Sequence, residues 1–198
     1  MKLLLHTCCA PCSVSCVKNI RAEGVEPHLF WYNPNIHPYT EYSARRDCLN
    51  EFAHNEKLNL TLIDEYGLRF FLYNAALPAM EYPAQLSQSA KENESRCLKC
   101  YAIRLEKTAV FAAKEGFDSF TTTLLISPYQ NHEAIKQTGE EMSSKYGIEF
   151  LYRDFRPLFR EGQAAARSKN FYMQKYCGCI FSEEERYTKN IPHRRGEA

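Results

Sequence analysis

The segment KLLLHTCCAPC, residues 2–12, decides the fold that we expect for this chain of 198 residues. Its first half, residues 2–6, is a short apolar run that predicts a buried strand. Three cysteines follow at once. Pro11 lies between them and suits the first turn of a helix, because the amide hydrogen that proline lacks has no helical partner there. A buried strand that leads directly into a helix is typical of a βαβ unit in a mostly parallel sheet.

The rest of the chain repeats this alternation. Apolar runs predict further strands at 26–32, 58–63, 119–125 and 148–152. Helical periodicity predicts helices at 13–22, 38–57, 66–76, 94–115, 130–146 and 163–174, with a loop at 77–92. We therefore expect an α/β fold with an open, mostly parallel, doubly wound sheet. The length predicts a single domain over residues 1–198, with a C-terminal helical extension at 153–198. Functional residues are then expected at the carboxyl ends of the strands.

The composition is that of a globular protein, with 44% hydrophobic and 25% charged residues. The 25 basic and 24 acidic residues nearly cancel, so the net charge argues neither for nor against a nucleic-acid partner. No apolar run reaches the roughly 18 residues that cross a bilayer, and MKLLLH is too short for a signal peptide. We expect a cytoplasmic protein without membrane contact. In that reducing compartment the nine cysteines are expected to bind metal or carry redox chemistry.

Five cysteines are expected to lie beside the carboxyl edge of the sheet: Cys8, Cys9, Cys12, Cys97 and Cys100. The first three lie between a strand and a helix N-terminus, where the helix dipole favours thiolates, the form that binds metal. The last two are three residues apart near the start of a predicted helix. They therefore share a face with Arg104, whose charge favours thiolates or a bound anion. That face lies away from the stripe that we expect to be buried: Leu98, Ala102, Leu105, Ala109 and Ala112.

The other four cysteines fall into two classes. Cys177-Gly178-Cys179 allows a strained, reducible disulfide, because glycine permits the tight backbone that such a ring needs. Cys16 and Cys48 lie inside predicted helices and are interpreted as small buried hydrophobic residues.

The residues alone leave three chemistries open. Iron–sulfur clusters take cysteine ligands at varied spacings, and the number of cysteines favours a cluster. The pairs Cys9–Cys12 and Cys97–Cys100 would also satisfy a structural zinc site. Cys9–Cys12 alone would suit metal-free, thioredoxin-like exchange, but that leaves the remaining cysteines unexplained. We favour the cluster over zinc, and zinc over the metal-free reading.

Several polar and aromatic residues are candidate substrate contacts, because ligands of such sheets bind beyond the carboxyl ends of the strands. These candidates are Asn33, His37, Tyr42, Arg104, Tyr129 and Asn131. Asn33-Pro34-Asn35 is equally typical of a turn, and Asn131 of a helix cap. His6 either serves the site or is a satisfied core histidine. Arg45 either contacts phosphate or, as we favour, lies on a solvated helix face.

The ordered motifs His6-x-Cys8-Cys9-Ala10-Pro11-Cys12, Cys97-x-x-Cys100-Tyr101 and Cys177-Gly178-Cys179 resemble those of the epoxyqueuosine reductases of the QueH type. The resemblance covers nearly the whole chain, including WYNPNIHP at 31–38 and Tyr42-x-x-Arg45. It implies an iron–sulfur oxidoreductase that acts on tRNA. Such an enzyme reduces the epoxide of epoxyqueuosine at the wobble position to queuosine, in the last step of queuosine biosynthesis.

The resemblance also assigns the cysteines. It implies a [4Fe-4S] cluster on Cys8, Cys9, Cys97 and Cys100, and a redox-active disulfide between Cys177 and Cys179. The fold is expected to resemble the nucleotide-binding α/β group of the HUP and PP-loop type. The Ser-Gly-Gly-x-Asp-Ser phosphate loop of the ATP-dependent members is replaced by cysteines, so ATP use is not expected.

A mechanism follows as a hypothesis. Removal of an epoxide oxygen needs a Lewis acid, two electrons and protons. Cys12 is spare in the four-cysteine set, so it is the expected ligand of an adjacent mononuclear iron that would polarise the oxygen. The Cys177–Cys179 pair would relay electrons from an external donor, which the sequence does not name.

Overall fold

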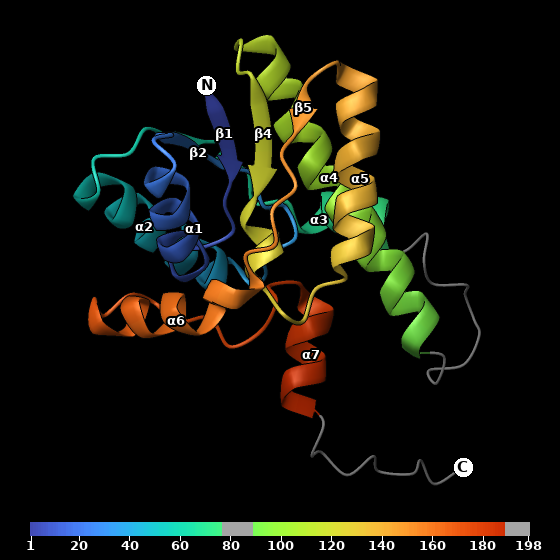
Figure 1. Cartoon of the computed structure of the whole chain (residues 1–198). Helices are drawn as coiled ribbons and strands as arrows, with labels where there is room; N and C mark the ends of the chain where they lie inside the picture. The colour runs from blue at the N-terminus through green and yellow to red at the C-terminus, as the bar shows by residue number, and fades with distance from the viewer. Residues whose placement is uncertain (77–88, 189–198) are drawn as a thin grey trace, which may run out of the picture.

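The computed structural model describes residues 1–76 and 89–188, which form one parallel sheet with helices on both faces (Figure 1). The strands are β1 (Leu3–His6), β2 (Pro27–Trp31), β3 (Leu60–Leu62), β4 (Ser119–Thr122) and β5 (Glu149–Phe150). Their order in the sheet is β3-β2-β1-β4-β5, and every neighbouring pair is parallel. The predicted α/β fold with an open, doubly wound sheet is confirmed.

The longer helices divide between the two faces. In Figure 1, α1 (Ala10–Ala22) and α2 (Tyr39–Asn55) lie on one side of the sheet, and α4 (Ser89–Lys114) packs with α5 (His132–Tyr146) on the other. The shorter helices are α3 (Leu68–Phe71), α6 (Phe159–Ser168) and α7 (Ile180–Thr188). A π-helical turn at Leu72–Ala76 and 3₁₀ turns at Thr123–Ile126 and Arg156–Leu158 complete the elements. No helix of the described residues has both the length and the hydrophobicity to cross a membrane.

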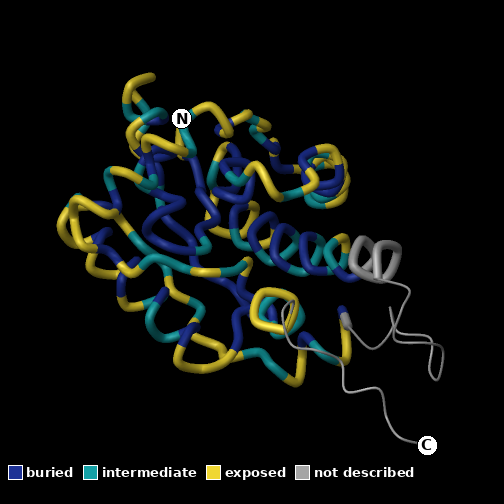
Figure 2. The backbone as a smooth tube through the Cα atoms, turned by 90° about the horizontal axis from the view of Figure 1, so that it is seen from below, coloured by how far each residue is buried: buried dark blue, intermediate teal, exposed yellow. Residues whose placement is uncertain are grey.

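The central strand explains why the first segment of the sequence is so apolar. β1 pairs with β2 on one side and β4 on the other, and helices cover both faces of the sheet, so Leu3, Leu4 and Leu5 are all at most 1% exposed. Strands buried on both faces are continuously hydrophobic rather than alternating. Figure 2 shows buried residues concentrated in the middle of the fold and exposed ones on the outer turns.

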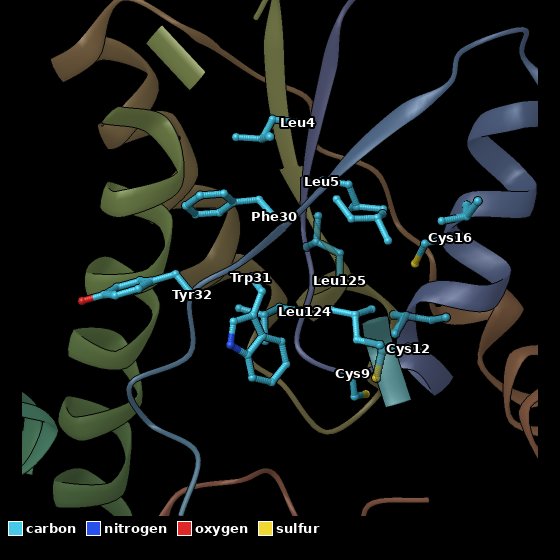
Figure 3. Packing of buried hydrophobic residues seen from close by; sticks show 14 of the residues in the cluster. Leu4, Leu5, Cys9, Cys12, Cys16, Phe30, Trp31, Tyr32, Leu124 and Leu125 are labelled. Atoms are coloured by element: carbon cyan, nitrogen blue, oxygen red, sulfur yellow. The ribbon is translucent and has the colours of Figure 1, made fainter. Parts of the chain in front are cut away.

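The strand order reverses between β1 and β4, because the chain moves outward to β2 and β3 and then returns to β4. At such a switch point the loops after the two central strands diverge, and this is where open α/β sheets bind their ligands. Cys8 and Cys9 directly follow β1 and therefore lie at this point. Figure 3 shows Cys9 and Cys12 at the end of the buried core, next to Leu124.

Some expected boundaries are wrong. The strand expected at 119–125 ends at Thr122, because Leu124 N–H donates to the Thr122 hydroxyl over 3.1 Å and begins a 3₁₀ turn. The helix expected at 163–174 occurs earlier, as α6, and α7 lies within the helical extension expected at 153–198, where no separate helix was specified. The loop expected at 77–92 lies outside the described residues up to position 88, and α4 already begins at Ser89.

The expected buried stripe of α4 is wrong at its first member. Leu98 is 41% exposed, although Leu105, Ala109 and Ala112 are fully buried. Figure 1 shows that the first turns of α4 extend beyond the ends of the strands, so that part of the helix does not pack on the sheet. Cys100, on another side of the helix there, packs with Phe71, Ala75 and Cys179 and is 8% exposed.

Candidate metal and redox site

Three thiols meet where β1 passes into α1. The Sγ atoms of Cys8, Cys9 and Cys12 all lie within 4.8 Å of one another, and those of Cys8 and Cys9 are 3.8 Å apart. Cys9 is the N-cap of α1 and Pro11 lies in its first turn, as expected. Cys9 and Cys12 are buried, whereas Cys8 is half-buried. We call these three residues the Cys8 group.

Hydrogen bonding within the Cys8 group makes its members chemically unequal. Hydrogen bonds from Cys12 and Cys9 hold the pKa of Cys8 well below the usual value for a thiol, and the charge of Arg104 lowers it further. Burial raises the pKa of Cys9, and the hydrogen bond to Cys8 is the main cause that raises the pKa of Cys12. These hydrogen bonds favour the thiolate form at Cys8 over the other two thiols, and the Cys8 sulfur also accepts from the Thr123 hydroxyl at 3.6 Å.

Cys97 and Cys100 lie on α4, as expected, but not within the Cys8 group. Among the described residues, the Cys8 group is where three or more potential metal ligands lie within 4.8 Å of one another. Cys100 instead packs with Phe71, Ala75 and Cys179. Burial raises the pKa of Cys97 to about 11 and that of Cys100 to about 12.

Arg104 connects the two sets of thiols. Its side chain is 2% exposed, and Nη1 lies 3.9 Å from the sulfur of Cys100. Its charge also acts on Cys8, as noted above. Nη2 donates to Oδ1 of Asn33 over 2.8 Å, and Asn33 in turn donates to the carbonyl of Thr7 over 2.9 Å. A buried cation thus lies beside both sets of sulfur atoms, held by Asn33, which is the second residue after β2.

The Cys177 loop, residues 176–179, joins the segment after α6 to α7. Cys177 is exposed and accepts from Nε2 of Gln130 over 3.4 Å, whereas Cys179 is 7% exposed and accepts from the backbone N–H of Ser182 over 3.4 Å. Both are free thiols in this structure. The redox-active disulfide stays a prediction.

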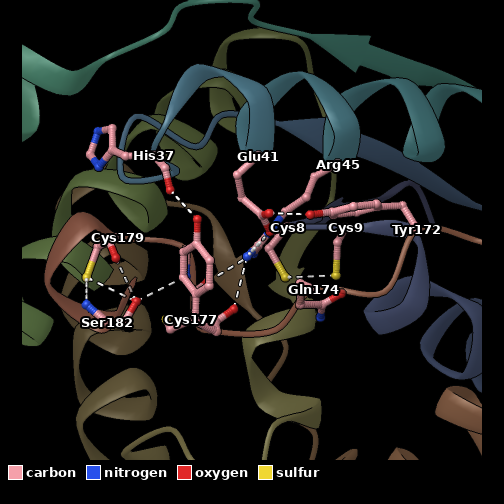
Figure 4. A network of polar contacts seen from close by, with 12 residues as sticks. Cys8, Cys9, His37, Glu41, Arg45, Tyr172, Gln174, Cys177, Cys179 and Ser182 are labelled. Atoms are coloured by element: carbon pink, nitrogen blue, oxygen red, sulfur yellow. Dashed lines mark hydrogen bonds and ion pairs between the residues drawn. The ribbon is translucent and has the colours of Figure 1, made fainter. Parts of the chain in front are cut away.

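Arg45 is the main functional residue that the sequence reading misjudged. The preferred interpretation, a solvated helix face, is wrong, because Arg45 is 1% exposed. It pairs with Glu41 and donates to the carbonyls of Tyr176 and Cys177 (Figure 4). Glu41, four residues earlier, could have indicated this ion pair in the sequence, since Glu and Arg at this spacing share one face of a helix.

Other residues of this edge were also missed or left undecided. Nε2 of Gln174 lies 3.4 Å from the sulfur of Cys12. His6 is fully buried, with Nδ1 2.9 Å from the Thr122 hydroxyl and Nε2 3.3 Å from the Tyr32 carbonyl. Burial lowers the pKa of His6 to about 3. The interpretation of His6 as a satisfied core histidine fits these contacts, and it is neutral at physiological pH.

The remaining substrate candidates occupy different environments. The Tyr42 hydroxyl is enclosed, because it accepts from Trp31 and donates to Asp64. His37 is fully buried against the rings of Tyr66 and Phe71, and neither ring nitrogen has a partner among the described residues.

On the next loop along the sheet, Asn131 caps α5 through Ala134 N–H at 3.0 Å, so the helix-cap alternative is confirmed. Tyr129 is 84% exposed. Cys16 and Cys48, interpreted as packing residues, are buried at 0% and 8% exposed. The structure therefore brings Asn33 and Arg104 to the thiols, encloses Tyr42, and leaves Tyr129 open to solvent.

The chemistry of these donors fits an iron–sulfur cluster. Clusters are held by soft thiolates, and buried thiolates need nearby positive charge, which Arg104 and Arg45 supply. Two buried polar atoms here have no partner among the described residues, Nε of Arg104 and Oε1 of Gln174. Buried polar atoms normally have a hydrogen-bond partner, so these two atoms without one are consistent with a further group between the thiols.

Comparisons with known proteins point to one family. The family model described as "Epoxyqueuosine reductase QueH" matches residues 3–185. Proteins named Epoxyqueuosine reductase QueH from Dehalococcoides mccartyi and Thermotoga maritima are 34% and 35% identical to this chain. The alignments cover 95% and 98% of this chain, and 96% and 97% of those proteins. A protein of the same name from Haemophilus influenzae is 36% identical over 91% of this chain and 71% of its own length.

Proposed function

The chain belongs to the epoxyqueuosine reductase QueH family, and on that premise we propose that it reduces epoxyqueuosine at the wobble position of tRNA to queuosine. This is the last step of queuosine biosynthesis. The reaction takes two electrons and two protons and releases the epoxide oxygen as water. The observation that carries the proposal is the convergence of thiols and buried guanidinium groups at the switch point of the sheet. The proposed compartment is the cytoplasm, where free thiols persist.

The proposed cofactor is a [4Fe-4S] cluster held by Cys8, Cys9, Cys97 and Cys100. Cys12 is then available to an adjacent mononuclear iron, because its sulfur belongs to the Cys8 group and already lies within 4.8 Å of two of these ligands. When bound, these centres supply electrons and a Lewis acid for the epoxide oxygen. Arg104 offsets the thiolate charge, and Asn33 orients Arg104 through the 2.8 Å hydrogen bond.

The Cys177 loop is suited to carry electrons inward from a donor at the surface. Cys177 is exposed, so an external dithiol can reach it, whereas Cys179 is buried against Cys100. Exchange of such a dithiol with a Cys177–Cys179 disulfide oxidises the donor and leaves both cysteines reduced. When the two thiols form their disulfide again, they release two electrons and two protons. Conversion of the epoxide to an alkene and water consumes the same number of each.

Substrate contacts are proposed for residues around this edge: Asn33, His37, Tyr42, Arg104, Tyr129 and Asn131. The exposed ring of Tyr129 suits stacking on a base that is turned out of the anticodon loop, since proteins commonly recognise unstacked RNA bases in this way. Arg104 offers its unpartnered Nε beside the thiols, where a polar substrate atom would meet it.

The test is an assay of tRNA nucleosides. Epoxyqueuosine-containing tRNA is incubated anaerobically with the protein and a reductant, digested, and analysed by mass spectrometry. Queuosine should appear with the wild type and with Cys48→Ala, which alters a buried thiol of α2 outside the site, but not with Cys8→Ala. If metal-loaded wild type leaves epoxyqueuosine unchanged, the proposed reaction is wrong.

A further inference from the structure

Arg45 is a buried cation that interacts in three directions, by direct contact in two of them and through its charge in the third. One is the carboxylate of Glu41 on the preceding turn of α2, to which Nε donates over 2.7 Å and Nη2 lies at 2.6 Å. Glu41 also accepts from the hydroxyl of Tyr172. Buried ion pairs are seldom justified by stability alone, because both charges must leave water. We therefore expect this buried ion pair to have a role beyond general stability.

The second direction is the Cys177 loop. Nη1 of Arg45 donates to the carbonyl of Cys177 over 3.0 Å, and Nη2 donates to the carbonyl of Tyr176 over 2.9 Å. The guanidinium carbon lies 5.7 Å from the centre of the Tyr176 ring. These contacts join positions 132 and 131 residues apart in the sequence. Figure 4 shows the guanidinium between α2 and this loop.

Two further bonds hold the same loop to the segment that precedes α2. The backbone N–H of His37 donates to the carbonyl of Gly178 over 2.7 Å, and the Tyr176 hydroxyl donates to the carbonyl of His37 over 2.6 Å. The loop backbone is therefore fixed through consecutive carbonyls, at Tyr176, Cys177 and Gly178. Gly178 allows this close approach, since a Cβ there would lie 3.2 Å from Nη1 of Arg45.

The third direction is the Cys8 group. The charges of Cys9 and Cys8 act on the Arg45 guanidinium, and Arg45 in turn favours the charged form of Cys9. One buried cation is thus shared between the predicted cluster ligands and the backbone of the predicted electron relay. Figure 4 shows Cys8 and Cys9 on one side of the guanidinium and the Cys177 loop on another.

We propose that Arg45 is the positioning residue of the Cys177 loop, holding its backbone against α2 so that Cys179 stays packed beside Cys100. The importance of the held loop for catalysis rests on the proposed reductase function. The holding of the loop by Arg45 does not depend on that function. An arginine is required because its planar fork serves a carboxylate and two carbonyls at once. A lysine keeps the charge but presents its donors from a single atom.

The experiment compares Arg45→Lys with Arg46→Lys in the full-length, anaerobically purified protein. Arg46 is the matched control, because it lies next in α2 but pairs with Asp47 and Asp64 on the surface. Endoprotease Lys-C is used to cut after Lys175, which is exposed and immediately precedes the Cys177 loop. Cleavage is followed by mass spectrometry, and alkylation of Cys179, which is buried in the closed loop, is measured in parallel against the buried Cys48.

Loss of one charge-assisted hydrogen bond should raise the open population of the loop by about tenfold. Cleavage at Lys175 and alkylation of Cys179 should therefore both accelerate by about that factor in Arg45→Lys. Arg46→Lys should match the wild type. Equal rates in Arg45→Lys and the wild type would overturn the proposal. So would an acceleration of equal size at lysines remote from the loop, such as Lys18 and Lys136, because that pattern means general destabilisation.

Arg45→Met would leave Glu41 buried without its cation, and this variant could fail to fold. The double variant Glu41→Gln with Arg45→Met removes both charges together and provides a second test with the same expected loosening at Lys175. Both readouts are independent of catalysis. If the wild type makes no queuosine but Lys-C still cuts at Lys175 more slowly in the wild type than in Arg45→Lys, the proposed reaction is wrong and the positioning role of Arg45 stands.

Discussion

Asn33 accepts a 2.8 Å hydrogen bond from Arg104, and this bond joins the segment after β2 to α4 at the candidate metal and redox site. Both residues were expected to be substrate contacts. Their geometry gives them an additional task, since Asn33 fixes a buried cation 3.9 Å from the sulfur of Cys100.

Replacement of Arg104 by Met should weaken the retention of iron. The substitution removes the positive charge beside Cys100 and Cys8, and loss of a residue that supports metal ligands typically lowers metal affinity by about 10- to 100-fold. The measurement is iron remaining after titration with a chelator. Lys107→Met is the control, since Lys107 lies on the same helix over the Tyr32 ring, outside the thiols. Equal retention in the two variants would contradict the role assigned to Arg104.

Gly178→Ala should destabilise the protein and slow the reductase. Gly178 has φ +132°, a region that side chains rarely adopt, and its added Cβ would press on Arg45 and Ile36 at 3.2 Å. Gly24→Ala is the matched control, because Gly24 has φ +76° and nothing within 4 Å of the added atom. Both should lose about 1–2 kcal/mol of unfolding free energy from backbone strain. Gly178→Ala alone should lower queuosine formation, and a similar rate for both variants would argue against a precisely held loop.

Cys177→Ser should separate electron supply from cofactor binding. Because Cys177 is exposed and is not one of the proposed cluster ligands, iron content should stay at the wild-type level. Sustained turnover driven by an external dithiol should fall to a small fraction of the wild-type rate, since no Cys177–Cys179 disulfide can form. Cys48→Ser should retain both properties. Full turnover in Cys177→Ser would remove this cysteine from the electron path.

Protonation of His28 should make the protein less stable in mild acid. Burial lowers the pKa of His28 in the folded state, so the unfolded chain binds its proton more tightly. Stability is therefore intact above the unfolded pKa of about 6.5 and is lost as the pH falls toward the lower folded value. His28→Gln removes this protonation, although it also loses the contact with Phe117. Denaturant unfolding between pH 5 and pH 8 should show the wild type losing stability relative to His28→Gln as the pH falls, whereas a pH-independent difference would contradict the linkage.

Local patterns explain which features could be predicted. The buried run of β1, the proline in the first turn of α1 and the thiols between them are encoded within a few residues, so their arrangement was visible in the sequence. The spacing of Cys97 and Cys100 likewise placed both on one face of α4 together with Arg104. These are short-range consequences of strand and helix geometry.

Long-range contacts explain what was missed. The burial of Arg45 depends on a loop more than 130 residues away, and its own helix shows only the pairing with Glu41. Leu98 was expected to be buried because of its period, but that turn of α4 extends past the sheet. Helix periodicity identifies one face of a helix, and the tertiary structure decides which part of that face is covered.

The proposed cofactor is tested most directly by iron, zinc and acid-labile sulfide analysis of the anaerobically purified protein. The account predicts a brown protein that contains iron and acid-labile sulfide, with iron in molar excess, because the mononuclear iron adds to the equal amounts in the cluster. Both should be lost in variants of Cys8, Cys9, Cys97 or Cys100 and retained in Cys16→Ser. A colourless protein with tightly bound zinc and no sulfide would contradict the account, as would full iron and sulfide content in all four ligand variants.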